Sequence, residues 1–160
     1  MPTGSMIMGG LIATTVLTIV IQASQSLHLT RMDMPYMLGT IFTPNRDKAK
    51  VYGAILHFVN GLVFATLYTL SFYFLNLKSW WWGIIFGLLH TAFVLSVGMA
   101  IMPGLNPRMA SEQQGPTVVR QLEPPGFLAL NYGLQTPLVI LVSHLIFGTV
   151  IGVIYQTVSS

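Results

Sequence analysis

Four long stretches of this 160-residue chain contain no Asp, Glu, Lys or Arg, and they constrain its fold more than any other feature. They lie at about residues 6–27, 51–75, 80–101 and 137–156. Each matches the roughly 20 residues that a helix needs to cross about 30 Å of hydrocarbon. A backbone in lipid must satisfy its own hydrogen bonds, and these stretches lack the alternation of barrel strands, so each is predicted to be a helix. We therefore expect an all-α fold: a transmembrane four-helix bundle that forms one integral membrane domain over residues 1–160, with loops at 28–50 and 102–136.

The composition supports a membrane location and excludes several kinds of site. Only 7% of the residues are charged, where a soluble domain has about 25%. The chain has no cysteine, which excludes disulfides, thiolate metal sites, iron–sulfur clusters and c-type haem attachment. Its seven Lys and Arg residues are too few and too scattered for nucleic-acid binding.

Successive loops between the four helices would lie on alternate sides of the membrane, and the basic residues are distributed unevenly between the two sides. The loops at 28–50 and 102–136 contain Arg31, Arg46, Lys48, Lys50, Arg108 and Arg120, whereas the short loop between the second and third stretches contains only Lys78. The positive-inside rule places the side with six basic residues in the cytoplasm, so both termini are expected outside.

The second and fourth stretches share a pattern. His57, Gly61 and Tyr68 have the same spacing as His144, Gly148 and Tyr155. A weaker echo is Met34-Pro35 after the first stretch and Met102-Pro103 after the third. We expect two parallel helix-hairpin repeats, related by an axis along the membrane normal. The spacing puts each His, Gly and Tyr on one helix face, and the two histidines at equal depth, where such an axis would let them face each other.

Small residues four apart mark faces where membrane helices pack closely. Three such pairs are present: Gly61 with Ala65, Gly83 with Gly87, and Gly148 with Gly152. We expect them to pack helices within the bundle, with self-association as the alternative. The mid-stretch amides Gln22 and Asn60 are expected to form interhelical hydrogen bonds.

Each apolar stretch contains a histidine or ends near one, and three roles remain open for them. They can be structural, hydrogen-bonded inside the bundle; they can hold haem or a metal; or they can handle protons. In the cofactor case His57 and His144 are the candidate ligands of haem b or a metal ion, with Tyr68 and Tyr155 behind them. A metal held by three imidazoles would use His28, His57 and His144, because His90 is expected about 6 Å deeper than the pair.

No catalytic motif of a hydrolase, metalloprotease or nucleotide-binding enzyme is present, so we expect no enzyme. The four carboxylates, Asp33, Asp47, Glu112 and Glu123, all fall outside the apolar stretches. Pumps and proton-coupled carriers use charged relays inside the membrane, so a transporter is disfavoured.

Several of these motifs together resemble an uncharacterised family of small four-span bacterial membrane proteins. They are the run from Gly10 to Thr15, Met34-Pro35 with Leu38-Gly39, the two His-Gly-Tyr motifs, and Gly83-x3-Gly87-x2-His90. The likeness covers most of the chain and departs at the longer 102–136 loop. It implies a multi-pass protein of the bacterial inner membrane and no particular chemistry.

Two classes of function compete on this basis. The first is a non-catalytic accessory or structural subunit that packs against other membrane subunits in a larger complex, for example a respiratory or other redox assembly. The second is an intramembrane haem- or metal-binding protein that uses the His57 and His144 pair.

Overall fold

The computed structural model describes residues 3–111 and 113–159, in which helices joined by loops are present and no strand is found. Four helical segments are long and apolar enough to cross a membrane: Met6–Ser26, Arg46–Phe74, Trp82–Leu105 and Thr136–Ser159. The all-α four-helix membrane bundle expected from the sequence is therefore confirmed.

The elements follow one another in a simple order. They are α1 (Thr3–Ser26), α2 (Met34–Gly39), α3 (Arg46–Phe74), α4 (Trp82–Phe93), the π-helix η1 (Val94–Gly98), α5 (Met99–Leu105), the 3-10 helix η2 (Phe127–Tyr132) and α6 (Thr136–Ser159). The short α2 and η2 lie in the two loops that the sequence left without assigned structure.

Polar residues decide where α3 begins. The Asn45 side chain accepts a hydrogen bond from the backbone N–H of Lys48 at 3.0 Å, which caps the helix, and Asp47 lies in its positive first turn. The helix therefore starts at residue 46, five residues before the start expected from hydrophobicity alone. Asp33 caps α2 in the same way, through the N–H of Tyr36 at 3.0 Å.

The third span is one helix with a change of winding in its middle. The α4 segment passes through the π-helical turn η1 into α5, which ends at Leu105 rather than near residue 101. Pro103 lies inside α5, where it cannot donate a hydrogen bond to the preceding turn. Met34-Pro35, by contrast, begins α2. The Met-Pro echo between the two halves is therefore not a structural equivalence.

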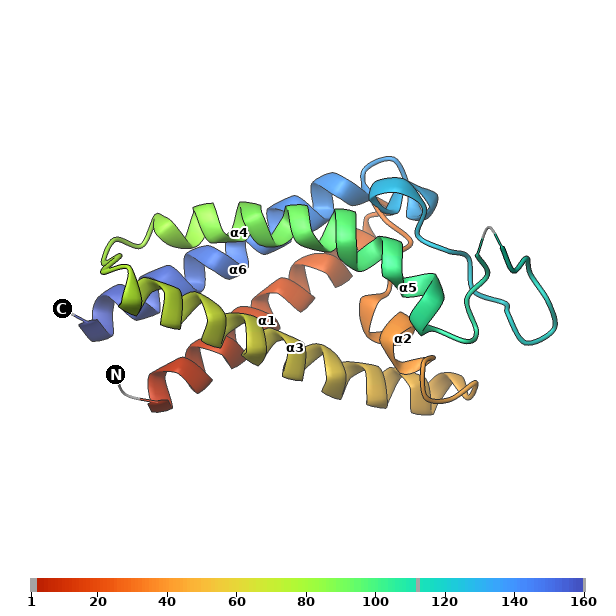
Figure 1. Cartoon of the computed structure of the whole chain (residues 1–160), viewed down its shortest axis with the longest axis horizontal. Coiled ribbons are helices and arrows are strands. Elements are labelled where there is room, and N and C mark those ends of the chain that lie inside the picture. The colour runs from red at the N-terminus through yellow and green to blue at the C-terminus, as the bar shows by residue number, and fades with distance from the viewer. Residues whose placement is uncertain (1–2, 112, 160) are drawn as a thin grey trace.

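The helices pack in the spatial order α3, α1, α6, α4. The closest pairs are α4 with α6 and α1 with α6, followed by α1 with α3, while α2 packs on the start of α3. Figure 1 shows α1 and α4 running in one direction and α3 and α6 returning, with both termini and the 75–81 link at one end. The arrangement has the topology of two helix hairpins, α1 with α3 and α4 with α6, joined mainly through α1 and α6.

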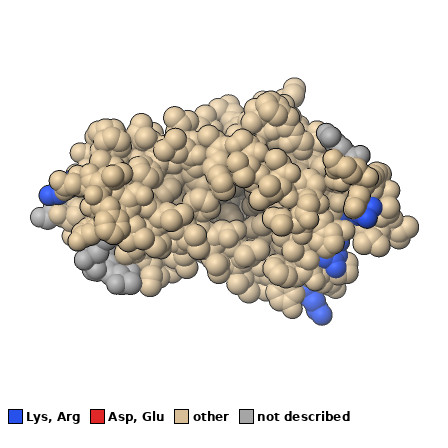
Figure 2. Space-filling view, in the orientation of Figure 1, with Lys and Arg blue, Asp and Glu red and all other residues tan. Residues whose placement is uncertain are grey.

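Between α3 and α4 lie aromatic side chains that hold the two backbones apart. Tyr68 and Phe72 of α3 meet Phe86 of α4 with ring centroids 5.3 and 5.1 Å apart. Phe64 stacks on His90 at 3.7 Å. Figure 2 shows this face of the molecule hollowed near its centre.

The end of the bundle opposite the termini contains the two long loops, and basic side chains gather there (Figure 2). Asn106, only 1% exposed, joins the loops by donating to the carbonyl oxygen of Met37 at 3.0 Å and to the Thr40 hydroxyl at 2.8 Å. The Arg108 guanidinium donates to the carbonyl oxygens of Thr40 and Ile41 at 2.6 and 3.2 Å. Both loops are thus built into the fold by buried polar contacts.

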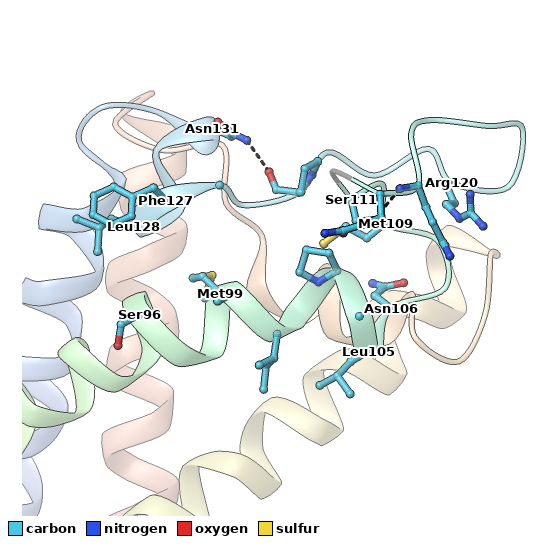
Figure 3. A pocket seen from close by; sticks show the side chains of 18 of the residues that line it. Ser96, Met99, Leu105, Asn106, Met109, Ser111, Arg120, Phe127, Leu128 and Asn131 are labelled. Carbon is cyan, nitrogen blue, oxygen red and sulfur yellow. Dashed lines mark hydrogen bonds between the residues drawn. The ribbon is translucent and has the colours of Figure 1, made fainter.

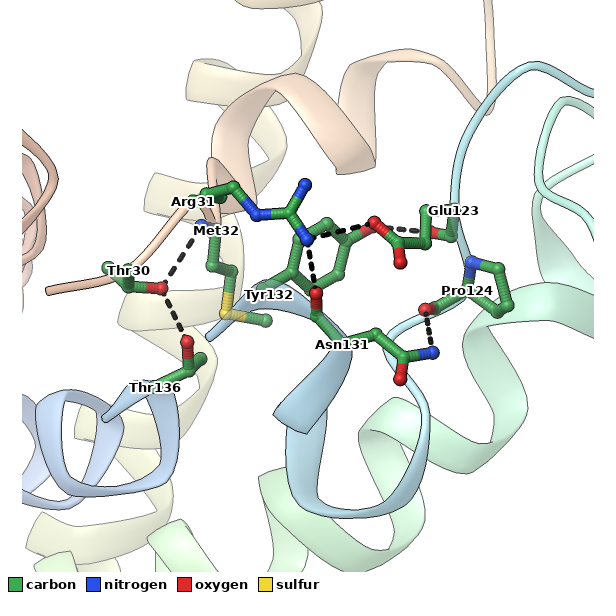
Figure 4. Close-up of polar contacts among 8 residues, drawn as sticks. All are labelled: Thr30, Arg31, Met32, Glu123, Pro124, Asn131, Tyr132 and Thr136. Carbon is green, nitrogen blue, oxygen red and sulfur yellow. Dashed lines mark hydrogen bonds and ion pairs between the residues drawn. The ribbon is translucent and has the colours of Figure 1, made fainter. Parts of the chain in front are cut away.

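A second polar network closes the same end around the start of α6 (Figure 4). The Thr30 and Thr136 hydroxyls are hydrogen-bonded at 2.8 Å, and Thr30 also accepts from the N–H of Met32 at 3.1 Å. Arg31 donates to the Asn131 carbonyl oxygen at 2.5 Å and to the Glu123 carboxylate at 3.2 Å. These contacts fix the α1–α2 connection against η2.

Candidate functional site

Two histidines meet in the interior of the bundle, although they are not the two that the repeat singled out. The rings of His90 on α4 and His144 on α6 contact each other edge to face with centroids 4.5 Å apart, and each residue is 8% exposed. His144 Nδ1 donates to the carbonyl oxygen of Ile140 at 2.8 Å. The Tyr68 hydroxyl donates to the Phe86 carbonyl oxygen at 2.8 Å and so accepts from His90 Nδ1 at 3.2 Å.

Glycines set the register that brings these two rings together. A Cβ on Gly83 would overlap the carbonyl oxygen of Gly148, and a Cβ on Gly87 would lie 2.5 Å from that of His144. The two helices are antiparallel, and side chains lean toward the start of their own helix. His90 therefore leans back toward the level of Gly87, while His144 leans toward the level of the next turn of α4, so the rings meet between them.

His57, the other half of the expected pair, is engaged elsewhere. The Thr18 hydroxyl of α1 donates a hydrogen bond to the Thr14 carbonyl oxygen at 2.7 Å. It therefore accepts a hydrogen bond from His57 Nε2 at 3.1 Å. The ring contact of His57 is with Phe58, at 6.3 Å, and not with His144. Among the described residues His57 and His144 make no ring contact with each other, because α6 packs mainly against α4 and α1 and only to a small extent against α3.

The two tyrosines also separate. Tyr68 contacts His90 rather than His57. Tyr155 lies at the far end of α6, where its ring packs edge to face on Phe72 at 5.3 Å. Neither tyrosine stands behind the histidine that its repeat predicts.

The three-imidazole metal site is not assembled either. His28 is exposed just beyond α1, at a positive φ of 59°, and lines a 590 Å³ pocket with Arg31, Asp33 and Arg46. Over the described residues, no three or more His, Asp or Glu side chains come together as a metal would require. His28 lies at the end of the bundle that contains the two long loops and most of the basic residues (the charged end), away from the interior where His57 and His144 lie.

The six small residues predicted at packing faces all lie at contacts between helices of the chain. Gly83, Gly87, Gly148 and Gly152 form the approach of α6 to α4 and to Trp80 just before it. Gly61 lies against Thr14, and the Cβ of Ala65 would be 3.0 Å from a Cβ on Gly10. These faces are covered within one copy of the chain.

The two amides behave differently from the other polar side chains of the spans. Asn60 is the central residue of α3, and its side chain is exposed. Gln22 of α1 is exposed as well. Neither side chain has a hydrogen-bond partner among the described residues, whereas Thr14, Thr18, Thr69 and Thr91 all bond to carbonyl oxygens of their own helices. The expected interhelical bonds of Asn60 and Gln22 are therefore not made within this chain.

At the charged end, Tyr132 is buried under the loop and has an altered acidity. Its hydroxyl donates to the Glu123 carbonyl oxygen at 2.5 Å. Burial, helped by the nearby Glu123 carboxylate and opposed by Arg31, raises the pKa of Tyr132 to about 12. The phenol is thus a neutral structural donor near neutral pH.

Sequence reasoning missed His90 as the partner of His144. The signal was present in the glycines, because Gly83 and Gly87 precede His90 on one helix while Gly148 and Gly152 follow His144 on another. Pairing these glycines in an antiparallel register places the two histidines together. No protein-family model, curated protein or solved structure matches this chain.

Proposed function

We propose that this protein is a non-catalytic, multi-pass membrane subunit that packs against a transmembrane helix of another polypeptide through the outer side of α3. Asn60 supports this proposal most directly. It lies at the midpoint of a 29-residue membrane helix, it is exposed, and it has no partner among the described residues.

The energetics favour a protein neighbour over lipid at this position. Moving an amide from water into hydrocarbon without a hydrogen bond costs about 4–8 kcal/mol. An interhelical hydrogen bond in a membrane is worth about 0.6–2 kcal/mol, and forming it also removes the amide from lipid. A partner helix with a polar side chain facing Asn60 satisfies the group, which lipid tails cannot do.

The histidines support a structural role rather than a ligand role. His57 bonds to Thr18, His90 to Tyr68 and His144 to Ile140, and all three bonds fix contacts within or between helices. As haem ligands His57 and His144 would each need a ring nitrogen free for the iron, whereas the Nε2 of His57 is bonded to the Thr18 hydroxyl.

The test is Asn60→Leu, with Thr66→Val as the matched control on the same helix. Thr66 is exposed but bonds to the Leu62 carbonyl oxygen at 2.8 Å, so its hydroxyl needs no partner. After gentle extraction from the native membrane, native electrophoresis should show that the Leu variant loses its larger assembly and that the Val variant retains it.

A photocrosslinking residue at position 60 supplies the second measurement. It should couple to protein, and the same residue at Val153, which is 44% exposed on α6, provides the comparison. If position 60 couples only to lipid and Asn60→Leu leaves the assembly size unchanged, the proposal is wrong.

We further propose that the charged end faces the cytoplasm of a bacterial cell and that both termini lie outside. The six-to-one distribution of basic residues supports this orientation, and the resemblance in sequence supports the inner membrane. The chain has no cysteine, so a single Cys at Val118 or at Lys78 reports one end each. An impermeant thiol reagent on intact cells should label the Lys78→Cys variant; labelling of Val118→Cys instead would reverse the orientation.

A further inference from the structure

A pocket of 1170 Å³ lies beside the third span, between the η1–α5 segment, the 106–126 loop and η2 (Figure 3). It exceeds the range of about 300–1,000 Å³ that is common for small-molecule sites. Because it runs along the last turns of Trp82–Leu105 and beyond them, it extends from the apolar part of the membrane span to the loop at its end.

The lining changes character along the pocket. Figure 3 places Phe127, Leu128 and Met99 toward the bundle, and Ser111 and Arg120 at the opposite end, among the loop residues. Phe127 is 79% exposed and so presents an apolar ring to whatever occupies this space. An apolar inner part followed by a polar, cationic outer part matches the two halves of an amphiphile.

Arg120 differs from Arg31 and Arg108 at this end of the molecule, and it differs from Arg46 in its surroundings, because the Arg46 guanidinium lies 5.9 Å from the centre of the Tyr36 ring. The guanidinium of Arg31 is paired with Glu123 and that of Arg108 with two carbonyl oxygens. The half-buried Arg120 side chain has no hydrogen bond or ion pair within residues 3–111 and 113–159, although Thr117 holds its backbone N–H at 3.1 Å. A pocket-lining cation without a partner calls for an anionic ligand group.

The walls depart from regular geometry where they line the pocket. Leu95 and Ser96 belong to the π-helical turn, and such turns occur often at functional sites. Leu128 and the adjacent Ala129 both have left-handed backbone conformations, with φ of 51° and 62°, which side-chain-bearing residues rarely adopt. Strain of this kind persists where the surroundings maintain it, and it clusters at binding sites.

We propose that this pocket binds an anionic glycerophospholipid of the surrounding leaflet. The phosphate of the lipid pairs with the Arg120 guanidinium, and its acyl chains lie along the apolar inner part beside α5 and Phe127. Arg120 lies beyond the end of the 82–105 span, in the loop that follows α5 (Figure 3), so a phosphate bound there would stand outside the apolar part of that span. The excess of basic residues at this end favours a headgroup without a cation of its own.

The experiment compares binding of phosphatidylglycerol and phosphatidylcholine to the full-length protein by native mass spectrometry from mixed micelles. The wild type should retain phosphatidylglycerol preferentially. Arg120→Gln should weaken that binding about tenfold or more, the effect of losing one charge-assisted hydrogen bond. Arg46→Gln is the matched control, because Arg46 carries the same charge at the same end but lies outside this pocket.

A second pair of variants tests the apolar part. Ala100 is exposed and lines the pocket, so Ala100→Trp should fill the space and reduce binding of both lipids; Val153→Trp, on α6, should not. Equal effects of Arg120→Gln and Arg46→Gln, or unchanged binding in Ala100→Trp, would overturn the proposal. Displacement of the lipid by inorganic phosphate alone would instead identify a site for the free ion and would also overturn it.

Discussion

Replacing Gly87 with alanine tests whether the contact between α4 and α6 determines the stability of the bundle. A Cβ at this position would lie 2.5 Å from the carbonyl oxygen of His144, 3.1 Å from its carbonyl carbon and 3.1 Å from the Cα of Leu145. Ordinary van der Waals contact begins at 3.4 Å. The difference, 3.4 − 2.5 = 0.9 Å, is the displacement that the helices must make, and all three neighbours are backbone atoms that cannot rotate away.

The expected cost follows from two opposing effects. Overpacking a close contact costs about 1–3 kcal/mol. Alanine also recovers up to about 1 kcal/mol of helix propensity relative to glycine. We expect a net destabilisation of about 1–2 kcal/mol, because the shift also disturbs Gly83 against Gly148 and the contact between the His90 and His144 rings.

The assay is equilibrium unfolding by SDS in lipid–detergent micelles, followed by circular dichroism. Gly98→Ala is the control, since its Cβ would meet only the Phe93 carbonyl oxygen at 3.9 Å, and this variant should be as stable as the wild type or slightly more so. If Gly87→Ala matches Gly98→Ala, the close α4–α6 packing described above does not exist in the membrane.

Three further predictions concern the charged end. Thr30→Val removes the bond to Thr136 and the acceptor for Met32 N–H, so it should cost about 1–3 kcal/mol in the same unfolding assay, while Thr15→Val, an exposed hydroxyl bonded within its own helix, should change little. Because the pKa of Tyr132 is raised from 10.0 to about 12, its contribution to stability is complete below pH 10 and is lost as the pH rises to about 12; Tyr132→Phe should flatten that part of the stability curve, and an unchanged slope would refute the assignment. Glu123→Gln should alter the free energy of unfolding by less than about 1 kcal/mol, because the side chains of its ion pair, Glu123 and Arg31, are 47% and 68% exposed respectively. A larger loss would mean that the pair is shielded from water in the membrane.

The sequence was sufficient for the number and helical type of the apolar spans, because the length of each uncharged stretch determines both. Their ends were less predictable. Hydrophobicity alone misses the cap at Asn45, and the apolar stretch expected to end near residue 101 continues as a helix through Pro103 to Leu105.

The interior polar contacts were harder to predict, because they depend on which helices are neighbours. The spacing shared by His57 and His144 describes each helix separately and does not say that α6 packs against α4 and α1. The glycine pairs contained that information, since only helices without side chains at the contact approach so closely. Nothing in the sequence predicted the left-handed backbone conformations of Leu128 and Ala129.

The spatial order of the helices has a consequence for how the chain can be divided. The 75–81 link joins α3 to α4, and these two helices make little backbone contact with each other. The two hairpins are held together mainly by the contact between α1 and α6. Cutting the link therefore removes few tertiary contacts. Residues 1–76 and 77–160, produced as separate polypeptides in one cell, should find each other in the bilayer and rebuild the bundle. Such a split protein would behave as a heterodimer of two helix hairpins, held together mainly by the contact between α1 and α6.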